Sequence, residues 1–168
     1  MDDGLRDLTA RQEGLKAFMR LYPQGVTVVT TWVGDRAYGM TVSSFTSVSM
    51  NPPLVLIAID RSANSYKAFT EAQMFAIHIL SSSQALLSEI FAGRQKNHDK
   101  FKDVNYKEGP EKVPLLNDTL AYLVCRRYRI YEAGDHDLII CEVLDVVIKN
   151  PDLKPLIYRN RAYTTVAS

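Results

Sequence analysis

The sequence predicts a mainly β protein, an antiparallel barrel with short helices at its periphery. At least six segments are rich in β-branched and aromatic residues, which favour strands. Consecutive strand segments lie close together and are separated by turn residues, whereas the pattern lacks the regular helical crossovers of a parallel sheet. A chain of 168 residues suits a single domain, residues 1–168, with a core that needs no disulfide or metal.

Composition argues against several functional classes. The net charge is +1 and no block of like charge stands out, so binding to nucleic acid or to a membrane surface is not indicated. The N-terminal segment lacks the apolar region of a secretory signal, and no apolar run is long enough to cross a bilayer. These features predict a cytoplasmic protein. P-loop, Rossmann, zinc-protease and hydrolase motifs do not occur in the sequence.

The first predicted element is a helix over residues 9–21. Its apolar residues recur near helical spacing, at Leu8, Leu15, Phe18, Met19 and Tyr22. Thr9 and Gln12 resemble a capping box at the start of the helix, and residues 23–25 end it.

A hairpin is predicted next. β-Branched residues favour a strand over 26–33, the Gly34-Asp35 pair makes a turn, and residues 37–49 continue as a second extended segment. Asn51-Pro52-Pro53 then breaks the pattern.

The remaining elements follow from the same criteria. They are a strand over 54–59, a short helix through Ala68 and Phe69, a strand over 74–80, a helix over 84–91, strands over 120–131 and 138–149, and a last segment over 158–166. Residues 81–83 are serines that offer N-caps for the helix over 84–91. The polar stretch 93–114 is predicted as a long loop, and loops of this length are often functional.

The cysteines and one histidine fall in apolar runs. Cys125 and Cys141 are interpreted as buried thiols, with a disulfide between adjacent strands as the alternative. Neither cysteine has a second cysteine or a histidine at metal-ligand spacing, so no metal site is predicted. His78, in FAIHIL, is interpreted as a core or interface histidine with satisfied hydrogen bonds.

Three polar segments are candidates for ligand binding. Residues 39–49 are crowded with serine and threonine, which can bind a phosphate or the carbonyls of a planar ring; the alternative is a solvated strand face. In residues 60–65, Arg61 can fork a phosphate beside Ser62, Asn64, Ser65 and a helix N-terminus; the alternative is a helix cap with a surface arginine. The basic stretch 93–101 can close over a phosphate or an adenine, or is simply a solvated loop.

The sharpest local signal is the predicted turn over 131–137. Gly134 supplies the backbone freedom of a tight turn and places His136 in an exposed position. We expect Asp135 and Asp137 to orient or charge the imidazole. The alternative is an Asp-rich turn that carries a chance histidine.

Together these pieces resemble the short-chain flavin reductase family, from about Phe18 to Val166. The resemblance is carried by FMRLYPQGVTVVTT, GMTVSSFTSVSMNPPLVLIAID, RSANSYKAF, FAGRQKNHDKF and the Gly134-Asp135-His136 triplet between two strands, in this order and spacing. The family includes the reductase components of two-component monooxygenases that act on 4-hydroxyphenylacetate and phenol.

The resemblance implies an antiparallel, Greek-key-like, FMN-binding split β-barrel that forms a homodimer, with the flavin at the dimer interface. It implies an NAD(P)H:flavin oxidoreductase that reduces FMN or FAD with NADH or NADPH and supplies reduced flavin to a partner oxygenase. In such an enzyme the flavin carries the hydride chemistry, and the protein contributes binding, positioning and electrostatics.

The resemblance also assigns residues by position. Flavin-ring contacts would be Thr41, Val42, Ser43, Ser44 and Phe45. Contacts to the phosphate and ribityl chain would come from two more serines of the segment 39–49, from the end of the next strand and from the loop after it. These residues are Ser47, Ser49, Ala58, Ile59, Asp60, Arg61, Ser62, Asn64 and Ser65. Lys100 and Phe101 match a closing loop, and His136 is the catalytic candidate that meets the nicotinamide. The loosest assignment is the C-terminal lining by Tyr158, Arg159 and Tyr163.

Two other functions stay open at this stage: a split-barrel flavoprotein oxidase of the pyridoxamine-phosphate type, and a non-catalytic flavin-binding protein. The sequence leaves open the choice between FMN and FAD and between NADH and NADPH. It also leaves open the identity of the oxygenase and whether flavin stays bound or diffuses.

Overall fold

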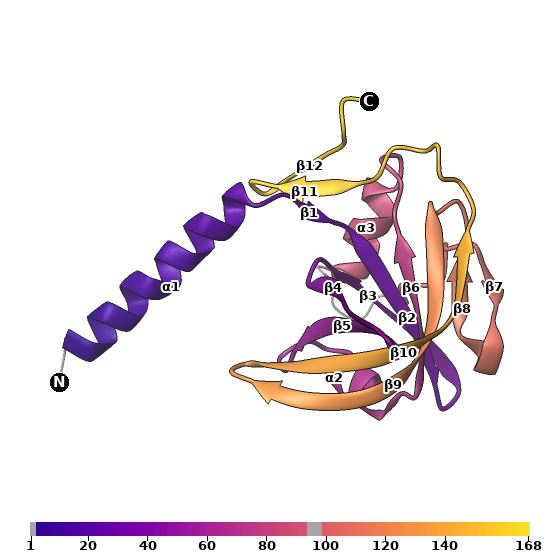
Figure 1. The fold of residues 1–168 in the computed structure, drawn as a ribbon, viewed down its shortest axis with the longest axis horizontal. Helices are drawn as coiled ribbons and strands as arrows, with labels where there is room; N and C mark the ends of the chain where they lie inside the picture. Colours follow the sequence, from indigo (N-terminus) through magenta and orange to yellow (C-terminus); the bar gives the residue numbers. More distant parts are fainter. Residues whose placement is uncertain (1–2, 94–98) are drawn as a thin grey trace.

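The computed structural model describes residues 3–93 and 99–168, and it forms a barrel from which one helix projects (Figure 1). The helices are α1 (Asp3–Leu21), α2 (Tyr66–Glu71), α3 (Ala85–Phe91) and the 3-10 helix η1 (Pro110–Lys112). The strands are β1 (Gln24–Gly25), β2 (Thr27–Val33), β3 (Arg36–Val42), β4 (Phe45–Met50), β5 (Pro53–Asp60), β6 (Met74–Ile79), β7 (Tyr106–Glu108), β8 (Pro114–Leu116), β9 (Ala121–Ala133), β10 (His136–Ile148), β11 (Ile157–Arg159) and β12 (Ala162–Thr164).

The barrel is a seven-stranded antiparallel sheet in the order β3-β2-β6-β9-β10-β5-β4. Its two edge strands, β3 and β4, are consecutive in the sequence and separated only by Ser43 and Ser44. The sheet therefore has to curve until its two edges approach each other. The backbone N–H of Ala58 on β5 donates to the carbonyl of Ser44, which extends the β4–β5 pairing to the bend between β3 and β4. The predicted split β-barrel is confirmed.

The inside of the barrel is packed by alternate residues of these strands. The main cluster includes the fully buried Ile57, Ile59, Phe75 and Ile139. A second cluster around Val28, Leu80 and Phe91 joins the barrel to α3 and to the small sheet β1-β11-β12. Buried residues alternate along β5, whereas β2 and β6 are buried along most of their length.

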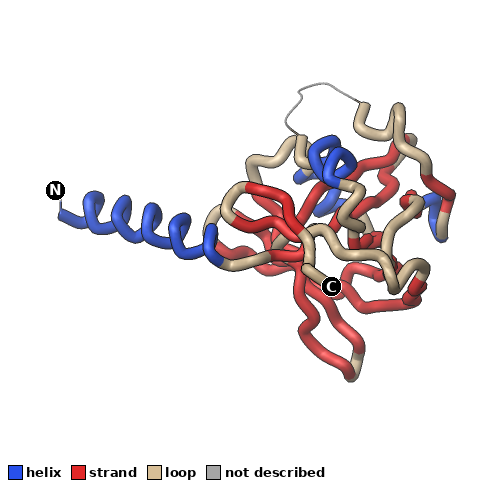
Figure 2. The backbone as a smooth tube through the Cα atoms, turned by 90° about the horizontal axis from the view of Figure 1, so that it is seen from above, coloured by secondary structure: helices blue, strands red, loops and turns tan. Residues whose placement is uncertain are grey.

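The first helix differs from its prediction. It begins at Asp3, so Thr9 and Gln12 lie inside the helix and the predicted capping box was wrong. Figures 1 and 2 show α1 pointing away from the barrel, and its apolar residues are exposed, with Leu15 at 62% and Phe18 at 67%. Its C-terminal end is tied down, since the N–H of Asn160 donates to the Arg20 carbonyl over 2.9 Å.

Three other local predictions need correction. Residues 37–49 form two strands on opposite sheet edges, because the chain bends at Ser43 and Ser44. The predicted loop over 93–114 contains β7 and η1. No serine side chain caps α3; instead the Gln84 side-chain oxygen accepts from the Ser81 N–H over 2.9 Å.

The two cysteines and His78 occupy the interior. Cys125 and Cys141 are free, fully buried thiols that contact each other, as the sequence indicated. The hydrogen bond with Cys141, and then burial, raise the pKa of Cys125, so it stays a thiol. His78 is fully buried and hydrogen-bonded, and its prediction is also confirmed. None of the helices in the described residues is long and apolar enough to cross a membrane.

Candidate active site

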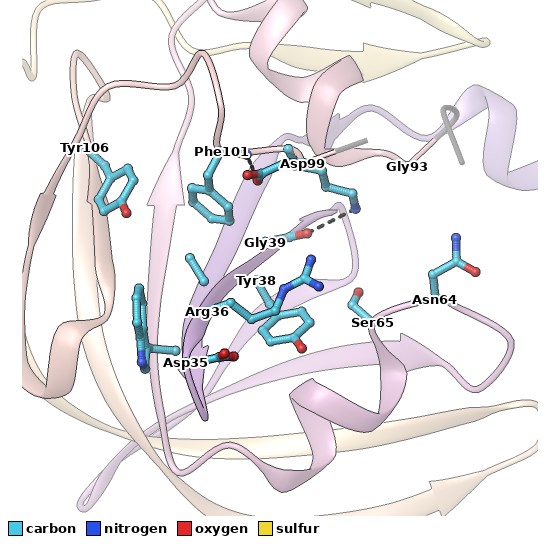
Figure 3. A pocket seen from close by; sticks show the side chains of 13 residues that line it. Asp35, Arg36, Tyr38, Gly39, Asn64, Ser65, Gly93, Asp99, Phe101 and Tyr106 are labelled. Carbon is cyan, nitrogen blue, oxygen red and sulfur yellow. Dashed lines mark hydrogen bonds between the residues drawn. The ribbon is translucent and has the colours of Figure 1, made fainter. Parts of the chain in front are cut away.

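A groove of about 1120 Å³ opens beside the β2–β3 turn (Figure 3). It lies where β3, the loop before α2 and the segment after residue 98 come together. Its lining residues are Trp32, Asp35, Arg36, Ala37, Tyr38, Gly39, Asn64, Ser65, Gly93, Asp99, Lys100, Phe101 and Tyr106. Four of the predicted site residues, Asn64, Ser65, Lys100 and Phe101, therefore share one cavity. Residues 94–98 of the predicted closing loop lie outside the described residues.

Lys100 is the central cation of this groove. Its half-buried ammonium group donates to the backbone carbonyls of Gly39 and Phe91 over 3.2 and 3.3 Å. Burial lowers the pKa of Lys100, and no carboxylate of the described residues pairs with it. A partly desolvated cation without a carboxylate partner is suited to an anionic ligand.

Gly39 has no side chain, so the Phe91 and Phe101 rings can pack against the backbone whose carbonyl binds Lys100. A Cβ atom at this position would lie 2.4 Å from the Phe91 ring and 3.2 Å from the Phe101 ring. The glycine lets the backbone of β3 approach these rings closely. Phe91 and Phe101 in turn stack edge to face, with their centroids 5.0 Å apart.

Aromatic and basic side chains that we did not predict complete the groove. The Arg36 guanidinium lies over the Tyr38 ring at 4.9 Å, and the Tyr106 ring contacts Phe101 with centroids 5.4 Å apart. A signal for two of them existed in the sequence, because Arg36 and Tyr38 alternate directly after the Gly34-Asp35 turn and so share a strand face. Planar rings and guanidinium groups are suited to stack on a planar ligand.

The hydroxyl groups of residues 39–49 fall into two sets, those that bond to other parts of the protein and those that are exposed. The Thr41 hydroxyl donates to the Ser88 carbonyl of α3 over 2.6 Å, and the Ser44 hydroxyl donates to the Ala58 carbonyl over 3.0 Å. Val42 and Phe45 pack on the core, so only the backbone of Val42 can face a ligand. Other hydroxyls are accessible: those of Ser43 and Ser47 are exposed.

Ser49 and the end of β5 have structural partners. The Ser49 hydroxyl accepts from the Asn51 N–H over 3.2 Å and shapes the turn into Pro52. Ile59 is fully buried, and the Ala58 backbone is bonded to Ser44 at the start of the β4–β5 pairing. Flavin contacts by Ser49, Ala58 and Ile59 stay predictions.

The loop after β5 is ordered by its own aspartate. The Asp60 carboxylate accepts from the N–H and the hydroxyl of Ser62, both over 2.8 Å, and these bonds lower the pKa of Asp60. The loop then exposes Asn64 and presents Ser65 to the groove. Helix α2 spans only six residues, so loop side chains rather than a helix dipole would have to bind an anion.

His136 lies at the rim of the barrel, where β10 begins, next to the loop over residues 60–65. It is the first residue of β10 and pairs directly with Asp60, the last residue of β5. Its ring nitrogen Nδ1 lies 2.7 Å from the Asp135 carboxylate, and 39% of its side chain is exposed. The expectation that Asp137 also orients His136 was wrong, because successive strand residues point to opposite faces and Asp137 is buried against Arg61 and Tyr66.

The predicted site residues near the C-terminus belong to the small sheet and not to the strands beside His136. Tyr158 and Tyr163 pack together on β11 and β12, and the Tyr163 hydroxyl bonds to Ser88 and Glu89 of α3. Arg159 donates to the carbonyl of Leu21 over 3.3 Å. Figure 1 shows this small sheet well away from the β9–β10 turn, so one copy of the chain does not bring Tyr158 or Tyr163 to His136.

Comparison with known proteins identifies the family. Residues 19–167 match the family described as Flavin reductase like domain. The chain belongs to this family. An FMN reductase (NADH), SmoA, from Agrobacterium fabrum is 42% identical over 142 residues, which are 84% of this chain and 79% of that protein.

A solved structure shares the fold of this flavin reductase-like chain. The NADH:FAD oxidoreductase SgcE6 of Streptomyces globisporus superposes with a TM-score of 0.84 at 33% identity, covering 94% of this chain and 88% of that one. Its structure has also been solved with NAD and FAD fragments. The reductase component of a flavin-dependent trigonelline monooxygenase from Acinetobacter baylyi is 34% identical over 84% of this chain, which spans 44% of that protein.

The groove fits a flavin nucleotide. Its partly buried aromatic rings suit a planar isoalloxazine or adenine, and Lys100 suits a phosphate. Asn64 and Ser65 add polar groups at the same wall. The lining thus combines aromatic rings, two cations and the carboxylates Asp35 and Asp99, a mixture of apolar surface with a few polar groups that is typical of a cofactor site.

Proposed function

We propose that this chain is an NAD(P)H:flavin oxidoreductase that reduces FMN or FAD and supplies the reduced flavin to a partner flavin-dependent oxygenase. The observation that carries the proposal is the groove, where the half-buried ammonium group of Lys100, which pairs with no carboxylate among residues 3–93 and 99–168, meets aromatic rings. Membership of the flavin reductase-like family supports it.

Each part of the site has a role in this proposal. Lys100, Asn64 and Ser65 hold the phosphate of the flavin nucleotide, while two exposed serines, Ser43 before β4 and Ser47 on β4, approach the flavin. His136 at the rim contacts the nicotinamide nucleotide and fixes its position. Bound flavin supplies the capacity to accept a hydride, so the protein needs no strong base of its own.

The test is an anaerobic stopped-flow mix of the protein with flavin and NADH, followed at the visible absorbance maximum of the flavin. Rapid bleaching of that absorbance is expected. Flavin that binds but is not bleached would instead assign a non-catalytic flavin-binding protein. A flavin that is bleached by a small amine substrate and not by NADH would assign an oxidase.

The proposal includes a homodimer with the site at its interface. The candidates Tyr158 and Tyr163 lie away from His136 in one copy, and a second copy can supply them. Apolar side chains also face solvent on β10, where Leu144, Val146 and Ile148 are exposed. Light scattering on a size-exclusion column should report twice the mass of the chain, and a monomer at micromolar concentration would contradict the dimer.

The oxygenase partner and the cytoplasmic location belong to the same proposal. The free thiols Cys125 and Cys141 are compatible with a reducing compartment. A supply role is tested by adding the chain, NADH and flavin to a flavin-dependent oxygenase that lacks its reductase. Substrate oxidation should then depend on all three additions.

A further inference from the structure

The turn of the β9–β10 hairpin is joined to the loop after β5 by one buried carboxylate. At this corner His136 pairs with Asp60, and the Arg61 N–H donates to the Asp135 carbonyl over 3.1 Å. The proposed nicotinamide side of the site and the proposed flavin loop therefore meet here.

Asp137 uses both of its oxygens at the corner. Oδ1 accepts from Nε of Arg61 over 2.9 Å and lies 2.9 Å from the Nη2 atom of the same guanidinium. Oδ2 accepts from the hydroxyl of Tyr66, the first residue of α2, over 2.5 Å. The Asp137 side chain is only 7% exposed, so these charge-assisted bonds are shielded from water.

The electrostatics agree with this geometry. The bonds from Tyr66 and Arg61 lower the pKa of Asp137, and the bond to Asp137 raises the pKa of Tyr66. The carboxylate thus stays charged and the tyrosine keeps the proton it donates. A second carboxylate, Glu132, lies 3.7 Å from Arg61 but is 87% exposed, where an ion pair is weak.

We propose that Asp137 is a positioning residue that locks the Arg61–Tyr66 loop to the β9–β10 turn, so that the flavin loop and His136 form one rigid unit. Asp137 and His136 are neighbours on β10 and point to opposite faces, so fixing one side chain fixes the backbone that presents the other. The inference rests on the proposed function for its kinetic consequence, but not for the structural link itself.

The link is tested first without flavin, by amide hydrogen exchange. Asp137→Asn keeps the shape of the side chain and removes its charge, and Tyr66→Phe removes one donor. Both variants should accelerate exchange of the peptide over residues 61–66 while β6 keeps its protection, which separates local loosening from global unfolding. Glu132→Gln neutralises the exposed carboxylate that lies near Arg61 outside the link. This variant should change neither the exchange over residues 61–66 nor the protection of β6.

The kinetic test measures whether the variants change both the affinity for flavin and the KM for NADH. Asp137→Asn should raise the flavin Kd, measured by fluorescence quenching, and the KM for NADH, each by about tenfold, because both sides of the site lose their fixed position. Tyr66→Phe should raise both by a smaller factor, and Glu132→Gln should leave both within twofold of the parent.

Two outcomes overturn the proposal. One is unchanged exchange over residues 61–66 in Asp137→Asn. The other is a rise in only one of the two constants, the flavin Kd or the KM for NADH. If Asp137→Asn does not fold, Tyr66→Phe decides by the same criteria. A parent protein that failed to bind flavin would refute the proposed function, and the exchange experiment would still judge the link.

Discussion

The polar groups inside the barrel differ from those at its rim in where their hydrogen bonds go. On β2, the buried hydroxyls of Thr27, Thr30 and Thr31 donate to the carbonyls of Val42, Pro114 and Met74 over 2.5 to 2.6 Å. Rim groups such as the Ser43 and Ser47 side chains are exposed instead. Interior polar groups thus hold strands together, and rim groups stay available to a ligand.

The two described histidines show this contrast most directly. His78 is fully buried between two protein partners: the Leu116 N–H donates to Nε2 over 3.0 Å, so Nδ1 carries the proton and donates to the Val28 carbonyl over 2.9 Å. His136 has one side-chain partner, the carboxylate of Asp135, and is partly exposed. Loss of His78 should therefore change stability, and loss of His136 should change catalysis.

Replacement of His78 is the largest expected effect. His78→Ala removes a packed ring, removes the imidazole donor to the Val28 carbonyl and leaves the Leu116 N–H without its imidazole acceptor, which should cost about 3 to 5 kcal/mol of unfolding free energy. Urea denaturation at pH 7.5 measures the loss. His136→Ala is the matched control and should lose less than about 0.5 kcal/mol. Equal losses in the two variants would remove the contrast between interior and rim.

The pH dependence of stability sharpens the same comparison. Burial lowers the pKa of His78 to about 4, whereas the unfolded chain has the ordinary value of 6.5. The unfolded state therefore binds more protons below pH 6.5, and stability falls as the pH drops from 6.5 toward 4. Between pH 7.5 and pH 5 the loss should be about 2 kcal/mol.

This loss is measured by urea denaturation at both pH values. His78→Gln should abolish most of the pH dependence, since an amide does not titrate. His136→Ala should retain it. The same slope in the His78→Gln variant as in the parent protein would assign the pH dependence to other groups.

A smaller loss of stability is expected where the rim meets the core. In Gly39→Ala the new Cβ would meet the buried Phe91 ring at 2.4 Å, and overpacking of this kind costs about 1 to 2 kcal/mol. Flavin affinity should fall too, because Phe101 has to move. Thermal unfolding and fluorescence quenching measure the two effects. Gly14→Ala on α1, where a Cβ meets nothing within 4 Å, is the control and should not destabilise the protein.

The division between interior and rim also explains what the sequence could predict. Short continuous apolar runs identify strands such as β5 and β6 and the buried state of His78, because burial imposes a local pattern. The fate of residues 37–49 depends on sheet closure, a long-range event that gives no local signal at Ser43 and Ser44. The start of α1 was missed because Thr9 and Gln12 have the spacing of a capping box but lie inside the helix, which begins at Asp3.

Within the site, single segments were easier to predict than their contacts. The loop over 60–65 and His136 do adjoin, because β5 pairs with β10. The partner of Asp137 could not be inferred, since Arg61 is 76 residues away in the sequence. Trp32 and Tyr106 were missed for the same reason, because they reach the groove from separate segments.

The smallest free-energy change is expected at His136, and it is a change in catalysis. An exposed ring beside Asp135 packs little against the protein, so His136→Ala should leave unfolding free energy and flavin Kd nearly unchanged. If His136 fixes the nicotinamide, the catalytic efficiency with NADH should fall about tenfold, or about 1.4 kcal/mol in barrier. Steady-state kinetics with varied NADH at saturating flavin measure this change. Asp135→Asn is the companion variant, because it removes the carboxylate next to the ring and keeps the ring; a partial loss is expected. Parent-like NADH kinetics for His136→Ala would show that another wall of the rim holds the nicotinamide, and the groove around Lys100 would be the place to search for it.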